Sequence, residues 1–232
     1  MARLIAQQWP QWGPAGIESA ICAGEIVVEG RVLTNPRAQV RVDAAVRHEP
    51  RVDLAGRRKL GWAIERFAVD VPRRTALDVG ASTGGFTTAW LASGARRVFA
   101  VDVGHGQLLG SLRQDDRVVS LERTNVADLS ASLVGDPIDL VSVDVSYLAL
   151  RTAVAQLGNV TVVPGAVLLG LVKPMFELRL PTIPTDRPTL SRACEKAAAG
   201  VDDAGWVVTE LDECPVRGGR GAIEFFLHAS RR

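Results

Sequence analysis

The chain has 232 residues, of which 47% are hydrophobic and 23% are charged, and its formal net charge is +1. This length and composition indicate a folded globular protein with room for one medium domain and one small domain, and they exclude a disordered or fibrous chain. The near-zero net charge excludes nucleic-acid binding driven by the charge of the whole chain, although residues 1–60 hold nine Lys or Arg against six Asp or Glu, which predicts a mildly basic first domain.

The cysteines and the apolar runs indicate which cellular compartment the protein occupies and whether it crosses a membrane. The longest apolar stretch, residues 160–172, is interrupted by proline and glycine and is too short to cross a bilayer as a helix. The first residues lack the apolar core of a signal peptide. Three cysteines stand far apart without metal-ligand spacing, so we expect reduced thiols and no bound metal at Cys22, Cys194 and Cys214. We therefore expect a cytoplasmic protein with no membrane partner.

The start of the chain is expected to form a small α/β domain. The residue pattern predicts a short helix at Ile17–Ala23, strands at Ile26–Val28 and Arg31–Leu33, and further extended chain at Ala38–Val42. A linker with scattered charges, Arg47–Arg58, follows.

The rest of the chain alternates strands and helices, which predicts a parallel sheet flanked by helices. The expected strands are Ala76–Val79, Val98–Val103, Val118–Leu121, Leu140–Val145 and Ala166–Val172. The expected helices are Lys59–Ala68, Gly85–Ser93, Gln107–Gln114, Ala149–Leu157 and Leu190–Ala204. Two β-rich runs close the chain as an antiparallel hairpin, Trp206–Leu211 and Ile223–His228. This layout predicts a Rossmann-like α/β fold, with a mostly parallel sheet and an antiparallel terminal strand.

The stretch TALDVGASTGGFT, residues 75–87, predicts a strand, a tight turn and the start of a helix. Gly80, Gly84 and Gly85 allow positive φ and let a ligand approach the main chain, while the helix start offers free N–H groups. Asp102 then ends the next apolar run, where nucleotide-binding folds place the acid that binds a ribose.

This turn matches neither GxGxxG nor GxxxxGK[ST], the patterns that bind dinucleotides and nucleotide phosphates. The acids at the two strand ends, Asp78 and Asp102, bind hydroxyls and amines rather than phosphates. We therefore expect a nucleoside ligand without a pyrophosphate, namely S-adenosylmethionine. An ordinary glycine-rich turn of an α/β domain remains the alternative.

The scarcity of lysine is a second signal, because 24 of the 27 basic residues are arginine. A chain that uses arginine almost everywhere keeps lysine where a compact, titratable cation is needed. Lys173 follows an apolar run and so faces the ligand crevice of an open α/β sheet, and Lys59 lies between the two domains. A plain surface lysine is the alternative at each position.

Six segments occur in the order found in one known family: RRKL at 57–60, LDVGASTGGFT at 77–87, VDVGHGQLLGSLRQDDRV at 101–118, VDVSYLAL at 143–150, LVKPMFE at 171–177 and GGRGAIEFFLH at 218–228. Together they resemble the TlyA family, whose members join an N-terminal RNA-binding domain to an FtsJ-like ribose methyltransferase. The resemblance covers nearly the whole chain and is strongest across residues 57–177. It implies an RNA-binding domain at residues 1–56 and a methyltransferase domain at residues 57–232.

The resemblance also implies site residues. The catalytic tetrad of FtsJ-like enzymes, which methylates a ribose 2′-hydroxyl, corresponds to Lys59, Asp144, Lys173 and Glu224. The implied cofactor is S-adenosylmethionine, and the residues expected to bind it are Asp78, Gly80, Ala81, Ser82, Thr83, Gly84, Gly85, Phe86, Asp102, Val103, Asn125 and Asp144. The implied partner is ribosomal RNA, either free or within ribosomal subunits.

The chemistry of these residue types suits the reaction. A ribose hydroxyl is a poor nucleophile at neutral pH, so an enzyme must align it with the methyl donor and stabilise the charge that develops on its oxygen. Lys173 is the candidate for that cation or for the base, Asp144 would orient Lys173, and Glu224 would fix Lys59 or the substrate ribose. Each acid has an alternative role as a satisfied carboxylate at a strand end.

The first domain resembles the αL RNA-binding domain of ribosomal proteins through AGEIVVEGRVLTNPRAQV at 23–40. Four basic residues are expected to contact RNA phosphates, Arg31, Arg37, Arg41 and Arg47. The alternative is a small packing domain with ordinary surface arginines.

The chain departs from the family pattern around the substrate side. Residues Trp9–Glu18 hold no arginine where the family has a basic helix, and the family's asparagine before the last acid is replaced by Ala222. A shorter segment broken by prolines, Leu178–Pro188, stands in place of a glycine-rich stretch. Three other functions therefore stay open: an RNA-binding or ribosome assembly factor with weak or no catalysis, a haemolysin, and a small-molecule methyltransferase.

Overall fold

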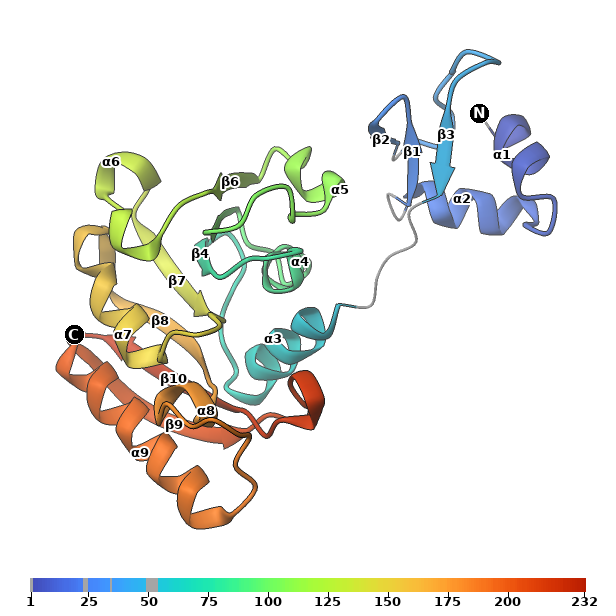
Figure 1. Ribbon diagram of the computed structural model, residues 1–232. Coiled ribbons are helices and arrows are strands. Elements are labelled where there is room, and N and C mark those ends of the chain that lie inside the picture. Colours follow the sequence, from blue (N-terminus) through green and yellow to red (C-terminus); the bar gives the residue numbers. More distant parts are fainter. Residues whose placement is uncertain (1, 23–24, 34, 49–53) are drawn as a thin grey trace. The chain divides into compact units, whose positions relative to one another are not determined.

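The computed structural model describes residues 2–22, 25–33, 35–48 and 54–232 (Figure 1). The described residues cluster into two compact units, one made of residues up to 48 with 109–115, the other of residues 54–108 with 116–232. Five residues of the expected linker, 49–53, lie outside the described part, as does Ala23 of the expected first helix. The expected domain boundary after residue 56 stays a prediction.

The described residues up to 48 in the first unit form two helices and a three-stranded antiparallel sheet in the order β2-β1-β3. Its elements are α1 (Ala2–Gln8), α2 (Pro14–Cys22), β1 (Ile26–Val28), β2 (Arg31–Leu33) and β3 (Val46–His48). A core of buried isoleucines and valines packs the helices onto the sheet, including Ile5, Ile17, Ile21 and Ile26.

The third strand of this sheet lies later in the chain than expected. Residues 38–42 form no strand, because turns on both sides of them use the backbone groups that a ladder would need. The N–H of Ala38 donates to the carbonyl of Asn35, and the N–H of Ala44 donates to that of Arg41. The extended pairing partner of β1 is instead Val46–His48.

The second unit is built around one seven-stranded sheet in the order β6-β5-β4-β7-β8-β10-β9. Its strands are β4 (Thr75–Val79), β5 (Arg97–Asp102), β6 (Val118–Glu122), β7 (Ile138–Val143), β8 (Val162–Val172), β9 (Trp206–Glu213) and β10 (Phe225–Arg231). Strands β4 to β8 are parallel to one another, and β10 is antiparallel to both β8 and β9. This confirms the predicted five parallel strands with a terminal hairpin.

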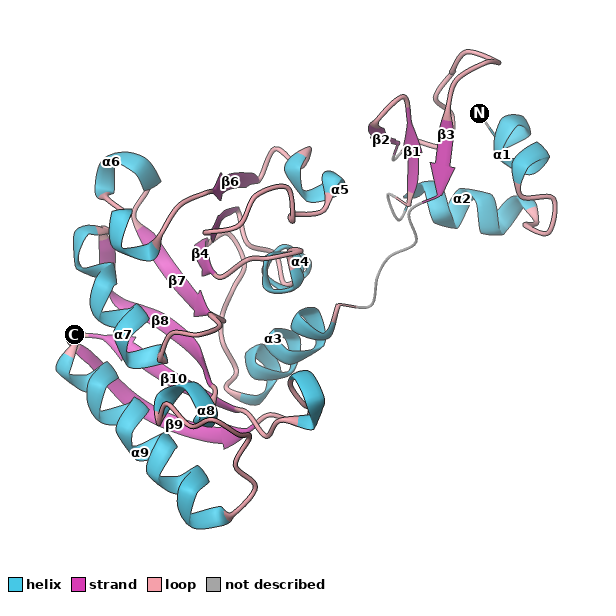
Figure 2. Ribbon diagram, in the orientation of Figure 1, coloured by secondary structure: helices cyan, strands magenta, loops and turns pink. Residues whose placement is uncertain are grey.

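Helices cover both faces of this sheet, and each face has its own hydrophobic core (Figure 2). Leu60, Phe86 and Trp90 bury α3 and α4 in one core, while Leu150 and Leu190 bury α7 and α9 in the other. The helices of this unit are α3 (Ala55–Arg66), α4 (Gly85–Ala92), α6 (Ala131–Val134), α7 (Leu150–Ala155), α8 (Pro174–Glu177) and α9 (Arg187–Asp203).

The expected helix at Gln107–Gln114 shrinks to α5 (Gly110–Arg113), and α8 was not expected. The N–H groups of Gln107 and Leu108 donate to the carboxylate of Glu122, at 3.0 and 3.3 Å, instead of entering a helix. Several strands also differ by a few residues from expectation, among them β8, which begins at Val162, and β9, which ends at Glu213. Strand β7 ends at Val143 and β10 begins at Phe225, so Asp144 and Glu224 lie just outside the strands.

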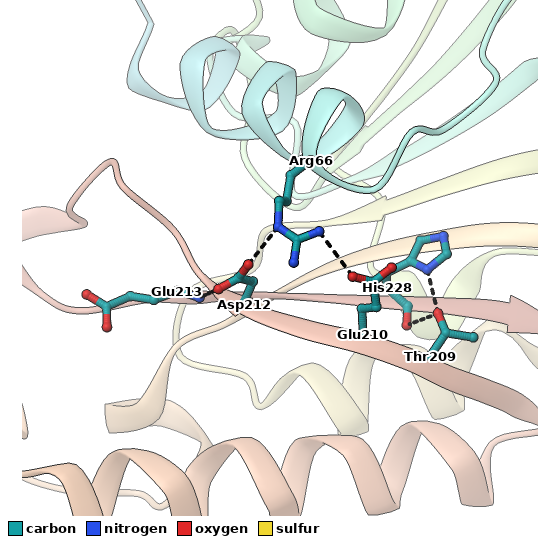
Figure 3. Close-up of polar contacts among 6 residues, drawn as sticks. All are labelled: Arg66, Thr209, Glu210, Asp212, Glu213 and His228. Carbon is teal, nitrogen blue, oxygen red and sulfur yellow. Dashed lines mark hydrogen bonds and ion pairs between the residues drawn. The ribbon is translucent and has the colours of Figure 1, made fainter.

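Helix α3 is attached to the terminal strands through its last turn (Figure 3). The Arg66 guanidinium donates to Asp212 at 2.8 Å and to Glu210 at 3.1 Å, both on β9. The ring of Phe67 stacks on His228 of β10 with 5.3 Å between centroids. These contacts fix the helix whose first turns carry Lys59.

Candidate active site

The turn after β4 has the predicted positive φ at two of its three glycines, since Gly85 is the first residue of α4. Gly80 and Gly84 have φ of 87° and 97°, and Ser82 has φ of 48°, a conformation that is uncommon outside glycine. The N–H groups of Gly80 and Ala81 both donate to the carbonyl of Val101 at 2.9 Å. A Cβ on Gly80 would overlap the backbone carbonyl of Asp144, so only glycine fits there. The turn is therefore held tightly against the neighbouring strands.

Asp102 connects this turn to the loop after β5. Its carboxylate accepts the N–H of Ser82 at 2.8 Å and the N–H of Gly104 at 2.7 Å. The Ser82 hydroxyl donates to the side-chain oxygen of Gln107 at 3.1 Å. Val103, the next residue after Asp102, is 69% exposed. The structure thus places an acid and an exposed apolar side chain together at the carboxyl edge of the sheet.

Asn125 lies in the loop after β6, at the same edge of the sheet. Its side-chain oxygen accepts the N–H of Ala127 at 3.0 Å and caps a short 3-10 turn, Val126–Asp128. Three neighbouring loops, after β4, β5 and β6, therefore present the residues expected to hold a nucleoside.

Asp78 occupies a different place from the one expected of a ligand-binding acid. Its side chain is fully buried, accepts the Thr87 hydroxyl at 2.7 Å and the Ser142 hydroxyl at 2.9 Å, and the indole of Trp90 donates to Ser142. Burial raises the pKa of Asp78 to about 6, although the two hydroxyls oppose this shift. Asp78 holds α4 to the sheet from the inside of the protein.

Two further residues expected to bind the cofactor also face inward. Phe86 is 3% exposed and stacks on Phe226 at 5.9 Å. Gly85 packs against α3, where an added Cβ would lie 2.9 Å from the Cα of Gly56. These two residues support the turn from the interior of the protein.

The four residues of the expected tetrad form two ion pairs. The Lys173 ammonium lies 2.5 Å from an Asp144 oxygen and 3.4 Å from the Ser146 hydroxyl. The Lys59 ammonium donates to Glu224 at 2.6 Å, and both side chains are less than 10% exposed. The side chains of Lys173 and Asp144 are partly exposed to solvent, whereas those of Lys59 and Glu224 are buried.

A pocket of about 400 Å³ opens at Lys173 and Glu224. Its polar lining also includes Ser146 and Arg220. Its apolar lining includes Tyr147, Met175, Phe176, Ile183 and Pro184. This volume is within the range of small-ligand sites.

The rings of Tyr147 and Phe176 form one wall of the pocket, 5.5 Å apart. Tyr147 is 91% exposed, and both Tyr147 and Arg220 have positive φ, at 66° and 56°. Backbone strain of this kind is typical of ligand sites. These residues were not predicted from the sequence, although Tyr147, the only tyrosine in the chain, gave a signal that could have been used.

The arginines expected to bind RNA are all exposed in the first unit: Arg31, Arg37, Arg41 and Arg47. Arg41 makes an ion pair with Asp43 at 2.8 Å. Trp9 and Trp12 stack on each other at 5.4 Å in the same unit, within the segment Trp9–Glu18 that holds no arginine.

In the part of the chain that the structure describes, no cluster of His, Cys, Asp and Glu is arranged to hold a metal ion. Likewise, none of the helices within the described ranges is long and apolar enough to cross a membrane.

Comparison with known proteins gives a consistent picture. The model of the FtsJ-like methyltransferase family matches residues 56–231. The chain is 36% identical over 216 residues to the 16S/23S rRNA (cytidine-2′-O)-methyltransferase TlyA of Mycobacterium tuberculosis, covering 89% of this chain and 80% of that protein. It is 32% identical to Hemolysin A of Brachyspira hyodysenteriae over 91% of each chain.

Solved structures show the same similarity. A proposed hemolysin from Streptococcus thermophilus superposes with a TM-score of 0.73 and 31% identity, covering 99% of this chain and 87% of that one. An S-adenosylmethionine-dependent methyltransferase from Mesorhizobium loti, at 13% identity and a TM-score of 0.53, covers 73% of this chain and 96% of that one and shares the Rossmann-like fold.

Proposed function

The chain belongs to the FtsJ-like methyltransferase family and, within it, to the TlyA group, and from this premise we propose that it methylates ribose 2′-hydroxyls of ribosomal RNA with S-adenosylmethionine. The observation that carries this proposal is the pair formed by Lys173 and Asp144, 2.5 Å apart at the mouth of a pocket and beside the glycine turn. Because the proposed substrate is ribosomal RNA, we propose that the reaction takes place in the cytoplasm.

The loops at the carboxyl edge of the sheet fit the cofactor. Gly80 lets the turn pack directly against the backbone of Asp144, which brings the turn expected to bind the cofactor next to the acid that pairs with Lys173. Asp102 and Asn125 would bind the nucleoside part through their polar side chains, and the exposed Val103 would pack on its base. When bound, S-adenosylmethionine supplies a methyl group that is already electrophilic.

The two ion pairs would provide charge stabilisation and proton transfer, which the cofactor does not provide. The Lys173 ammonium would stabilise charge on the attacking ribose oxygen, and Asp144 holds that ammonium in place. The hydroxyl proton must leave as the oxygen–carbon bond forms, and Asp144 or a neutral Lys173 would accept it. Glu224 lines the same pocket as Lys173 and holds Lys59 by an ion pair, so this second pair would add a further charged group on the substrate side.

An assembly factor without catalysis is less well supported, because both charged pairs are fully assembled. The changed residues Ala222, Ile183 and Pro184 line the same pocket as Lys173 and Glu224, so the departures from the family pattern alter the pocket wall while both pairs are kept. We further propose that the first unit contacts RNA phosphates through its exposed arginines, since phosphate contacts position RNA without reading its sequence.

The test is methyl transfer from labelled S-adenosylmethionine to free ribosomal RNA and to each ribosomal subunit. We expect label at a 2′-oxygen, detected as resistance of the adjacent phosphodiester to alkaline cleavage. Lys173→Ala should reduce transfer by about 100-fold or more, because it removes the cation that stabilises the attacking oxygen, and should bind S-adenosylmethionine as the wild type does. Transfer to a base, or undiminished transfer by Lys173→Ala, would contradict the proposal.

A further inference from the structure

Two loops after neighbouring strands carry the solvent-facing ion pair. The loop after β7 runs from Asp144 through Ser146 to the start of α7 at Leu150, and Lys173 directly follows β8. Because Asp144 and Lys173 belong to different loops, their 2.5 Å separation depends on how these loops are held together.

Glu177 connects the same two loops inside the protein. Its side chain is buried, and one carboxylate oxygen accepts the N–H of Leu150. The other oxygen lies 2.5 Å from the Arg151 guanidinium, which also donates to the Glu177 carbonyl at 3.0 Å. The end of α8 is therefore attached to the first residues of α7.

The connection between Glu177 and Lys173 is short and rigid. Helix α8 has only four residues, begins with Pro174, and has Lys173 as its N-cap. The N–H groups of Phe176 and Glu177 donate to the Lys173 carbonyl at 2.9 and 3.0 Å. Because so short a helix is not stable by itself, its position is set by the contacts of Glu177.

Burying the Glu177 carboxylate costs free energy, so its presence in the interior calls for an explanation. Burial raises the pKa of this carboxyl above its ordinary value, against the opposing effect of Leu150 and Arg151. A hydrophobic side chain of similar size would stabilise the core at least as well as a buried ion pair. Glu177 is also absent from the lining of the pocket, so it does not contact a substrate there.

We propose that Glu177 is a positioning residue that sets the distance between Lys173 and Asp144 by holding the loops after β7 and β8 together. This inference rests on the proposed methyl transfer. It assigns to the buried carboxylate an effect on the rate of the reaction rather than on cofactor binding.

The test compares Glu177→Gln with Asp139→Asn. Asp139 is a matched control, because its carboxylate also accepts a backbone N–H, that of Thr75 at 2.9 Å, and links β7 to β4 at the opposite end of the strands. We expect kcat to fall by about tenfold or more in Glu177→Gln, since small displacements of reacting groups are costly. KM for S-adenosylmethionine should stay within about twofold, and Asp139→Asn should match the wild type in both.

A second measurement reports the position of Lys173 without any activity. The chain has only three lysines, Lys59, Lys173 and Lys196, so protein labelled with ¹³C at lysine Cε shows three signals, which lysine-to-arginine variants assign. We expect the Lys173 signal to shift in Glu177→Gln and to stay unchanged in Asp139→Asn, while Lys196 is unchanged in both.

The outcomes separate the inference from the proposed function. A Lys173 signal that does not move and an unchanged kcat in Glu177→Gln overturn the inference, as do equal reductions of kcat in both variants. Wild-type protein that transfers no methyl overturns the proposed function, and the lysine spectrum still tests the positioning of Lys173. If Glu177→Gln does not fold, Arg151→Gln takes its place, because Arg151 is partly exposed and its replacement keeps the hydrogen bond between Glu177 and Leu150.

Discussion

At the residue scale, the buried carboxylates of the second unit are either paired with an opposite charge or hydrogen-bonded to hydroxyl groups. Asp78 is enclosed by Thr87 and Ser142, and Glu224 is enclosed with Lys59. These two arrangements respond differently to substitution, because the first is a single acid that can become neutral and the second is a pair of opposite charges.

Asp78 makes the stability of the protein depend on pH. Its pKa of about 6 exceeds the ordinary value of 3.8, so the folded state favours the protonated form and loses stability as pH rises from about 4 through 6. Asp78→Asn should mimic the neutral acid. Relative to the wild type, its free energy of unfolding should rise by up to about 3 kcal/mol between about pH 4 and pH 7. Urea unfolding across this range measures the difference, and a difference independent of pH would contradict the prediction.

The buried pair of Lys59 and Glu224 should be costly to break on one side only. Lys59→Ala leaves the Glu224 carboxylate buried without its cation and should lower the free energy of unfolding by about 3 kcal/mol. The double variant Lys59→Met with Glu224→Gln should recover most of that stability. Chemical denaturation compares the two, and we expect methyl transfer to be abolished in both. Equal destabilisation of the single and double variants would show that the pair is not coupled.

At the scale of elements, the close approach of α3 and α4 links the glycine turn to Lys59. The two helices meet at Gly56 and Gly85, whose backbones leave no space for a side chain on Gly85. Because α3 carries Lys59 and α4 begins at the turn, a shift between these helices would displace both parts of the site.

Gly85→Ala tests this packing. The added Cβ would lie 2.9 Å from backbone atoms of Gly56, so the helices must separate, and we expect the free energy of unfolding to fall by about 1 to 3 kcal/mol with reduced methyl transfer. Gly61→Ala on α3 is the control, because nothing lies within 4 Å of the added atom. It should stabilise the protein by up to about 1 kcal/mol. Thermal unfolding of the two variants decides, and similar melting temperatures would contradict the prediction.

The elements that could be predicted are those whose own residues carry the signal. The strands of the large sheet are apolar runs of ordinary strand length, and the glycines of the turn allow the positive φ that it needs. Helices α5 and α8 and strand β3 have only three or four residues, and contacts distant in the sequence, such as Glu122 with Gln107 or Glu177 with Leu150, define them. Patterns local to the chain do not contain that information.

The same reasoning applies to the site. The resemblance to a known family and the scarcity of lysine predicted a tetrad, and the structure pairs its residues as Lys59 with Glu224 and Lys173 with Asp144. The inward position of Asp78 was missed because an acid next to a glycine turn looks the same in sequence whether it faces a ligand or the core. The aromatic wall formed by Tyr147 and Phe176 was missed because the side chains converge only after two loops have folded.

At the scale of the whole molecule, the two units would have different roles in the proposed reaction. The second would bind cofactor and perform the transfer, and the first would add affinity for RNA. Net charge alone would not reveal this division, because the chain as a whole carries only +1.

Removing positive charge from the first unit should therefore weaken RNA binding without changing cofactor affinity. For Arg31→Gln with Arg47→Gln we expect weaker RNA binding and a shallower salt dependence, with the log–log slope smaller by about 0.7 to 0.9 for each phosphate that is no longer neutralised. The control removes the same charge from the second unit, through Arg73→Gln with Arg232→Gln, both exposed. Titrations of labelled RNA at several salt concentrations measure the effect, and equal slopes in both variants would contradict it.

The order of the strands has a consequence for synthesis on the ribosome. Strand β10 is made after β8 and β9 but is inserted between them, and the residue before it, Glu224, completes a pair with Lys59, 165 positions earlier in the chain. A nascent chain that lacks residues 225–231 leaves β8 as an open edge and cannot pair β9 with the sheet. The sheet can therefore be completed only after β10 has left the ribosome, and until then the growing polypeptide presents an unpaired strand edge that favours aggregation or chaperone binding.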